Sequence, residues 1–372
     1  MAIRSITDIS ESVYRYTASE LSEKAKEYDE TDSFPREPFD YFADLGVLRI
    51  PFSREQGGLG GSLQDILSVI RTVSTTCSST ASVLLTHLSF GIMPVYLYGT
   101  EDQKRRFLPD LLNGSKIGAY AFNELDSGSD LSLIETSAVE TDEGWVLNGS
   151  KHYISNAGEA SVYSVVSRMQ YRNGEQEVGI LLVHPEMKGL SVGQQEEKMG
   201  IRGMPVASLS FDRVVVSHEN VLGGQAVGES ACYVIKTLNK LYVAAQAIGI
   251  AEGVLKKALS YMQKDRQFGK RLIDLPNNQY RMADAYTEMN AAKALLDKVE
   301  AFDPESSDYY CMVKLKATSV AVDTAKTALQ LTGGYGFMRN NSIERFVRDA
   351  ELTHIYGGGS DTQRAMIARN WL

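Results

Sequence analysis

The feature that most constrains the fold of this chain is a double change in the spacing of its apolar residues. Over the first 112 residues they recur with helical spacing, as in 65–76. From about 117 to 222 they follow short strands separated by turns, and Asn173-Gly174 is typical of a two-residue hairpin. After Gly223 steps of three and four return, as over 282–299. The pattern predicts a helical unit, a β unit and a second helical unit.

We therefore expect an α+β protein of three units. These are an N-terminal helical domain at 1–115, a central β domain at 116–224 and a C-terminal helical bundle at 225–372. Short antiparallel strands at this spacing favour a barrel or small sandwich. No linker is long enough to separate the units, and a chain of 372 residues can bury a large core.

Charge and composition exclude several classes of function. A net charge of −9 disfavours nucleic acids and anionic membranes as partners. We expect no membrane span, because no stretch approaches the roughly 20 apolar residues that one needs. The polar, acid-rich start predicts no secretory signal and therefore a cytoplasmic protein. Neither a disulfide framework nor a metal site is expected from the spacing of the three cysteines, Cys77, Cys232 and Cys311, or of the five histidines.

Several glycine-containing and polar motifs follow one another along the chain. The β unit opens with Ala-Tyr-Ala-Phe-Asn-Glu-Leu-Asp-Ser-Gly-Ser-Asp at 119–130, and Lys-His-Tyr-Ile-Ser-Asn follows at 151–156. The helical unit carries Arg-Gln-Phe-Gly-Lys at 266–270 and Gln-Leu-Thr-Gly-Gly-Tyr-Gly at 330–336. Alone, each of these is most simply a turn or a strand. Their order and spacing together are specific.

In that order and spacing the motifs resemble those of the acyl-CoA dehydrogenase family, over nearly the whole chain. The resemblance implies an N-terminal helical domain, a central antiparallel β-barrel or sandwich and a C-terminal four-helix bundle. It also implies FAD as cofactor and a homodimer or homotetramer. No Gly-x-Gly-x-x-Gly dinucleotide unit competes with this interpretation.

The resemblance assigns the flavin contacts position by position. Asn123 takes the place of a family threonine, and Tyr153 and Ser155 stand where an aromatic covers the ring and a hydroxyl reaches N5. Arg266 and Phe268 stand where the family contacts the diphosphate across a subunit boundary, which suits a guanidinium. The full implied set is Phe122, Asn123, Ser129, Tyr153, Ser155, Arg266, Phe268, Gln279, Gln330, Gly333, Gly334, Gly359 and Asp361.

The same resemblance identifies a missing base. Residues 354–364 resemble the family segment Ile-Tyr-Glu-Gly-Thr-x-x-x-Gln-Arg, in which the glutamate takes a proton from the substrate. Here Gly357 occupies that position, and a second base position used in the isovaleryl branch falls on Asn239. Neither residue can accept a proton at neutral pH. Tyr356 and Gly357 are expected to line the substrate side of the flavin.

Four interpretations of the missing base remain open. Asp361 could be a relocated base, or simply a charge at a helix N-terminus. The substrate could instead be a hydroxy- or amino-acyl group on an acyl carrier protein, oxidised at its terminal carbon, as in the family branch that makes extender units for polyketides and nonribosomal peptides. The chain looks most similar to that branch. A flavin monooxygenase and a scaffold without turnover are the other two. The expected partners are an acyl thioester of a carrier protein or of coenzyme A, and an electron-transfer flavoprotein or oxygen as electron acceptor.

Overall fold

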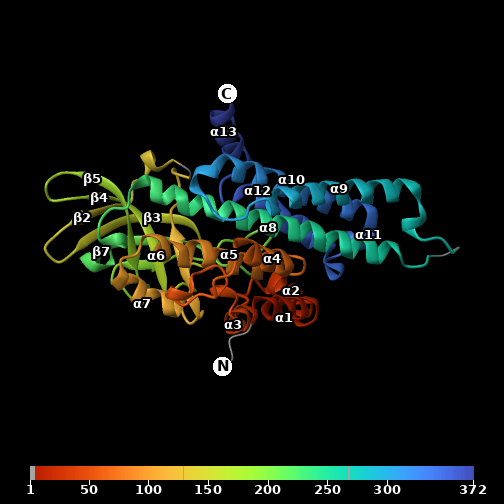
Figure 1. The fold of residues 1–372 in the computed structure, drawn as a ribbon, viewed down its shortest axis with the longest axis horizontal. Helices are drawn as coiled ribbons and strands as arrows, with labels where there is room; N and C mark the ends of the chain where they lie inside the picture. The colour runs from red at the N-terminus through yellow and green to blue at the C-terminus, as the bar shows by residue number, and fades with distance from the viewer. Residues whose placement is uncertain (1–4, 129, 267–268) are drawn as a thin grey trace.

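The computed structural model describes residues 5–128, 130–266 and 269–372, and it confirms the order of helical, β and helical units. Figure 1 shows the β strands gathered at one end and the long C-terminal helices extending to the other end. The N-terminal helices lie along one side of both. The bounds of these helices are α1 (Ile6–Ala18), α2 (Glu20–Thr31), α3 (Arg36–Leu45), α4 (Leu63–Ser74), α5 (Ser78–Thr86), α6 (Met93–Tyr98) and α7 (Glu101–Leu112).

Local capping explains where several of these helices begin. At the start of α4 the Ser62 side chain accepts a hydrogen bond from the Asp65 N–H, while the Asp65 carboxylate accepts one from the Ser62 N–H. Such a reciprocal pair satisfies two backbone donors that the helix leaves free. The same box opens α1 and α7.

The stretch Ser78–Tyr98 corrects the expectation that no apolar segment approaches the length of a membrane span. Its 21 residues reach that length and hydropathy, but 83% of the apolar window is buried inside the fold. The segment joins α5 to α6 through a π-helical turn at His87–Ile92. It is therefore a core element of this structure.

The β domain is a seven-stranded sheet with its own apolar core. The expectation of purely antiparallel pairing is wrong for two pairs, because β4 runs parallel to both β1 and β2. The chain between β1 and β4 contains two other strands, which gives it the length that a parallel crossover needs. The strands are β1 (Gly118–Ala121), β2 (Ser137–Glu140), β3 (Trp145–Ser155), β4 (Val162–Gln170), β5 (Gln176–Val183), β6 (Leu190–Val192) and β7 (Val206–Val216).

The C-terminal unit is built on α8 (Gly228–Met262), a helix of 35 residues and about 52 Å. It packs against α4 on one side and α10 on the other, and most of its circumference is buried. Gly249 allows the close approach to α4, since a Cβ there would lie 2.2 Å from the Arg71 carbonyl oxygen. The remaining helices are α9 (Pro276–Asp297), α10 (Ser307–Thr332), α11 (Gly334–Phe337), α12 (Ile343–Ile355) and α13 (Ser360–Trp371).

Candidate active site

A buried ion pair organises the loop that follows β1. The Lys151 ammonium donates to Glu124 Oε1 at 2.8 Å and to the Phe122 carbonyl at 3.1 Å, and both charged side chains are nine-tenths or more buried. The Glu124 carboxylate also accepts from two backbone N–H groups, those of Glu135 and Thr136. Burial acts to raise the pKa of Glu124, but these hydrogen bonds together hold it below its usual value. The loop that begins after Phe122 is thus anchored at its base.

Strand β3 presents the expected flavin residues beside this loop. The His152 N–H donates to the Asn123 carbonyl at 2.8 Å, which ties the strand to the loop. The register between β3 and β7 shifts after Lys151, and Tyr153 has a φ of +57° and is 57% exposed. A bulge of this kind turns a side chain out of the sheet. Tyr153 is therefore free to cover a ligand, whereas Ser129 lies outside the described residues.

The residues expected at the adenosine end lie in the C-terminal unit. A Cβ on Gly333 or Gly334 would meet nothing within 4 Å, so the backbone there is open to a close ligand. Gln279 and Gln330 are exposed, and Arg266 donates to the hydroxyl of Tyr261. Phe268 lies outside the described residues. Figure 1 shows α11 and the turn between α8 and α9 at the opposite end of the molecule from β3. One chain therefore does not bring the two groups of flavin residues together.

The two expected base positions face each other. Gly357 has a φ of +65° between α12 and α13, and a Cβ there would lie 2.7 Å from Asn239 Oδ1 and 3.3 Å from Val243 Cγ2. The next nearest atom is Cε of Lys314, at 3.8 Å. None of these three neighbours is an acid. The amide oxygen of Asn239 occupies the place where a longer side chain at 357 would begin.

The side-chain oxygen of Asn239, next to Gly357, is a hydrogen-bond acceptor without a donor among the described residues. Asn239 is fully buried on α8, and its Nδ2 donates to Ser89 Oγ at 2.9 Å, from the π-helical turn. Its Oδ1 finds no donor in the described part of the chain. A buried acceptor without a donor costs about 1–3 kcal/mol, so it is a position where a ligand donor would be favourable. Tyr356, by contrast, donates its hydroxyl hydrogen to Gln246 Oε1.

Three lysines that the sequence did not predict as site residues, Lys314, Lys240 and Lys236, lie near the Asn239 and Gly357 pair. Lys314 donates to the carbonyls of Tyr356, at 2.7 Å, and Gly358, so it fixes the loop that carries Gly357. Burial and the neighbouring Lys240 lower the pKa of Lys314 to about 7. Lys240 donates to Cys311 Sγ at 3.2 Å and Ser307 Oγ at 3.3 Å. Lys236 precedes Lys240 by one turn on α8, and this i, i+4 pair is the only pair of charges in the stretch 231–251, which was the available signal.

Asp361 does not lie in this site, so its interpretation as a relocated base is corrected. Its side chain is 99% exposed and pairs with Arg364 at 2.7 Å on the outer face of α13. The helix begins at Ser360 with Gly359 as N-cap, and this start directs Asp361 to solvent. The alternative interpretation, a charge in the first turn of a helix, describes its position.

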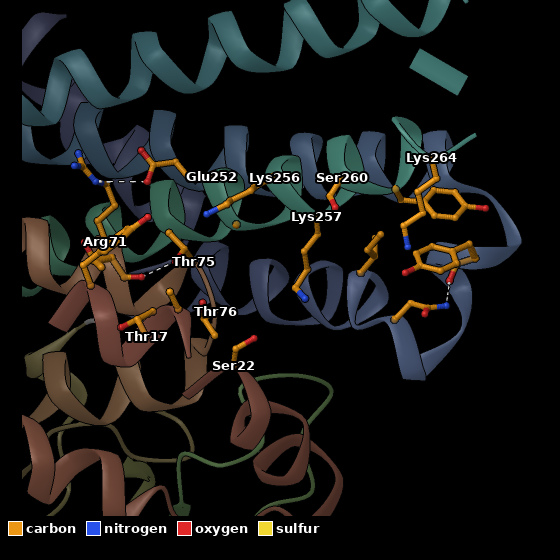
Figure 2. Close-up of a pocket in the computed structure, with 18 residues that line it drawn as sticks. Thr17, Ser22, Arg71, Thr75, Thr76, Glu252, Lys256, Lys257, Ser260 and Lys264 are labelled. Atoms are coloured by element: carbon orange, nitrogen blue, oxygen red, sulfur yellow. Dashed lines mark hydrogen bonds and ion pairs between the residues drawn. The ribbon is translucent and has the colours of Figure 1, made fainter. Parts of the chain in front are cut away.

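A separate cleft lies elsewhere in the described structure. It has a volume of about 670 Å³ and lies between α1, α4 and the second half of α8. Figure 2 shows Lys256 and Lys257 on α8 and Lys264 just beyond the end of this helix, with Arg71 at the other end of the cleft, paired with Glu252. Lys256 is about 25 Å along α8 from Asn239, so this cleft and the base positions are separate places. No group of residues that could hold a metal ion occurs in the ranges that the structure covers.

Comparisons with known proteins match all three units. The family descriptions are acyl-CoA dehydrogenase, N-terminal domain, for residues 5–115, middle domain for 119–214 and C-terminal domain for 234–372. The short-chain specific acyl-CoA dehydrogenase of Clostridium acetobutylicum is 34% identical over 96% of this chain and 95% of its own length. The structure of butyryl-CoA dehydrogenase from Megasphaera elsdenii is similar with a TM-score of 0.93, at 29% identity, and covers 100% of this chain and 99% of that one. The prolyl acyl carrier protein oxidase AnaB, at 24% identity, a TM-score of 0.91 and coverage of 98% of both chains, shows the shared fold alone.

Proposed function

Because the chain belongs to the acyl-CoA dehydrogenase family, we propose that it oxidises the Cα–Cβ bond of a short acyl thioester with FAD as the oxidant. The observation that supports the proposal is the contact between Gly357 and Asn239, the residues that the resemblance identifies with the family's two base positions: a Cβ on Gly357 would lie 2.7 Å from Asn239 Oδ1. The Clostridium relative acts, by its name, on short-chain acyl-CoA. This supports coenzyme A as the carrier of the acyl group.

The residues present fit FAD. Tyr153 projects from a bulge beside a loop that the Glu124 and Lys151 pair anchors, and this arrangement suits an isoalloxazine ring. The open backbone at Gly333 and Gly334 suits a phosphate or adenosine group. When bound, FAD supplies the acceptor for the hydride that leaves Cβ.

The chain's own residues would position the thioester and hold the loop at 356–358. Lys314 fixes this loop by donating hydrogen bonds to the carbonyls on either side of Gly357. Oxidation of a Cα–Cβ bond also requires a group that takes the proton from Cα. Gly357, Asn239 and the exposed Asp361 do not provide one, so the proton acceptor must be another residue.

A second candidate function is the oxidation of a hydroxyacyl thioester, carried by coenzyme A or by an acyl carrier protein in extender-unit biosynthesis. The observation that favours it is Asn239 Oδ1, a buried acceptor that a substrate hydroxyl would satisfy. On a carbon that bears a hydroxyl, the departing proton leaves from oxygen. The three lysines near this atom would repel the ammonium of an aminoacyl group, so we favour the hydroxyl form.

The test is anaerobic mixing of the flavin-loaded protein with matched thioesters. We expect butyryl-CoA to bleach the flavin absorbance, and we expect a much slower change with 3-hydroxypropionyl groups on coenzyme A or on a carrier protein. Bleaching by the hydroxyacyl thioesters alone would favour the second candidate. No bleaching by any thioester would contradict both. Reduction by a thioester without added reductant also argues against a monooxygenase, which needs a separate electron donor.

We also propose that two chains complete each flavin site. The expected ring contacts and adenosine contacts lie at opposite ends of one chain, as described above (Figure 1). Large apolar side chains near the adenosine contacts are exposed, among them Phe337 and Tyr280. Light scattering of the flavin-loaded protein should give a homodimer or homotetramer. A flavin-loaded monomer would contradict this proposal. The proposed electron acceptor is an electron-transfer flavoprotein, with oxygen as the alternative.

A further inference from the structure

We propose that Lys236 is the group that takes the Cα proton, in place of the absent glutamate. The inference rests on the proposed function, since only oxidation of a Cα–Cβ bond requires such a group. It concerns a residue at neither of the two positions where the family carries its base.

The position of Lys236 is the first argument. It lies on α8 three residues before Asn239, so the two side chains leave the same face of the helix about 4.5 Å apart along its axis. Its Nζ is 3.7 Å from the ring centroid of Phe122. Phe122 immediately precedes the loop that the Glu124 and Lys151 pair anchors. Lys236 therefore stands between the proposed flavin loop and the former base positions.

The second argument is that the other two lysines are engaged. The Lys314 ammonium donates to two backbone carbonyls, and the Lys240 ammonium donates to a hydroxyl and a thiol. Lys236 Nζ has neither a hydrogen-bond acceptor nor a carboxylate partner within the residues that the structure describes. An amine that is free of such contacts can turn its lone pair to a substrate. Among these three lysines, Lys236 is the one free to act on a ligand.

The surroundings of Lys236 favour its neutral form. Burial, and then the positive charge of Lys240, lower the pKa of Lys236 to about 8, while Cys232 acts in the opposite direction. Cys232 is itself held protonated by burial, which raises its pKa to about 11, and it faces Tyr120 on β1 and Lys151 on β3. Neither Tyr120 nor Lys151 contributes a negative charge next to the amine. Values near 7–8 are those that suit a lysine general base at neutral pH.

The chemical step balances with FAD as the oxidant. The neutral amine of Lys236 forms an N–H bond as the Cα–H bond breaks, and the electron pair of that bond becomes the Cα–Cβ double bond. Hydride leaves Cβ for FAD in the same oxidation. The products are an enoyl thioester, the reduced cofactor and a Lys236 ammonium, which then releases its proton to solvent.

Two substitutions of Lys236 distinguish a role as proton acceptor from a role as a fixed positive charge. Lys236→Met removes both properties, and Lys236→Arg keeps the charge but cannot be deprotonated in a protein. We expect both variants to slow flavin reduction by butyryl-CoA at least about 100-fold, the lower range for a lost general base. Lys256→Met, on the same helix but in the separate cleft, is the matched control and should reduce at the wild-type rate.

The pH profile gives a sharper result. The base must be neutral, so the reduction rate should rise as the pH rises through about 8 in the wild type and in Lys256→Met. The residual rate of Lys236→Met should lack this rise. An arginine variant as fast as the wild type would show that Lys236 acts only through its charge and would overturn the proposal. An unchanged methionine variant would do so as well.

A readout that does not depend on turnover completes the test. Acetylation of lysines by acetic anhydride, followed by mass spectrometry across pH, measures where each amine loses its proton. Lys236 should become reactive near pH 8, below the ordinary lysine value of about 10.4. A Lys236 midpoint at the ordinary value would contradict the proposal.

Failure of the inference can be told from failure of the proposed function. If butyryl-CoA bleaches the wild-type flavin but Lys236→Met is equally fast, the function stands and the inference is wrong. If the wild type is not bleached, the function is wrong, and exchange of the Cα protons of acetyl-CoA in D₂O then decides the role of Lys236. Exchange that is lost in both Lys236 variants would support it, and absent exchange in the wild type would overturn it.

Discussion

The loop after β1, which we call the flavin loop, and the loop at 356–358, which we call the base loop, differ in how their buried charges are paired. At the flavin loop, Glu124 and Lys151 are paired, and every oxygen of the carboxylate has a donor. Around Gly357, three lysine ammonium groups have only neutral partners or none among the described residues, and Asn239 Oδ1 has no donor. A closed network stabilises one geometry, whereas unpaired polar groups cost free energy until a ligand satisfies them.

The difference indicates which half of the site is a fixed support and which half meets the substrate. Unsatisfied buried groups and lysines of lowered pKa concentrate where proteins bind and transform ligands. An unsatisfied acceptor and lysines of lowered pKa both occur around the loop at 356–358, where a glycine stands in place of the expected acid. The proposed cofactor half, by contrast, keeps a donor for each oxygen of the Glu124 carboxylate.

The largest expected effect comes from a substitution that removes the ion pair anchoring the flavin loop. Replacing Glu124 with leucine leaves the Lys151 ammonium buried without a counter-charge and removes the acceptor of two backbone N–H groups. Removal of one partner of a buried ion pair typically costs about 3–5 kcal/mol. We expect a loss of that order in the free energy of unfolding, measured with urea, together with loss of bound flavin.

An exposed ion pair of the same domain is the matched control. Arg172 and Asp142 approach to 2.6 Å, but both side chains are half-exposed or more. Asp142→Ala should therefore keep the flavin and change the unfolding midpoint far less than Glu124→Leu. Equal effects of the two substitutions would mean that the buried network does not anchor the loop.

The second prediction returns the absent acid to the base loop. Gly357→Glu alone places a side chain at a φ of +65° and within 2.7 Å of Asn239 Oδ1. We expect it to cost about 1–2 kcal/mol of stability, because non-glycine residues are strained in this region. Adding Asn239→Ala removes the contact and makes room for the carboxylate.

In a Lys236→Met background, the pair Gly357→Glu and Asn239→Ala should raise the rate of flavin reduction by butyryl-CoA about 100-fold. Gly357→Glu without the second change should give a smaller recovery. The control is Gly357→Gln with Asn239→Ala, which has the same shape without an acid and should recover nothing. Recovery by the glutamine variant would show that space, not a proton acceptor, limits this site.

Local patterns explain how much of the fold the sequence predicts. Helical spacing over 282–299 and the turn at Asn173-Gly174 depend on neighbouring residues. The helix appears as α9, and the hairpin appears between β4 and β5, although its turn has three residues between the paired Tyr171 and Glu175 instead of two. The parallel pairing of β4 with β1 and β2 depends on contacts between distant segments, so no local pattern shows it. The burial of the apolar segment 78–98 is likewise a property of the whole fold.

In the candidate site, too, the sequence predicts single positions but not the contacts between distant segments. Resemblance to the family identified Gly357 and Asn239 separately, but their contact depends on the packing of α8 against the loop after α12. Lys236 and Lys240 were visible only as two charges in the otherwise uncharged stretch 231–251 of α8, and Lys314 gave no signal because its partners are backbone carbonyls from a distant loop. The direction of Asp361 depended on the residue at which α13 begins, which a sequence fixes poorly.

The smallest expected effect is at the position that the sequence first suggested as a new base. Asp361 is exposed and pairs only with Arg364 of its own helix, one turn away. Surface pairs of this kind contribute little, because water and salt screen both charges. Asp361→Asn should therefore leave the unfolding midpoint unchanged and, in protein that keeps its flavin, should leave the rate of flavin reduction by butyryl-CoA unchanged as well. A drop in that rate without a loss of flavin would mean that α13 turns toward the site when the substrate binds, and the contrast between the two loops would then have to include this helix.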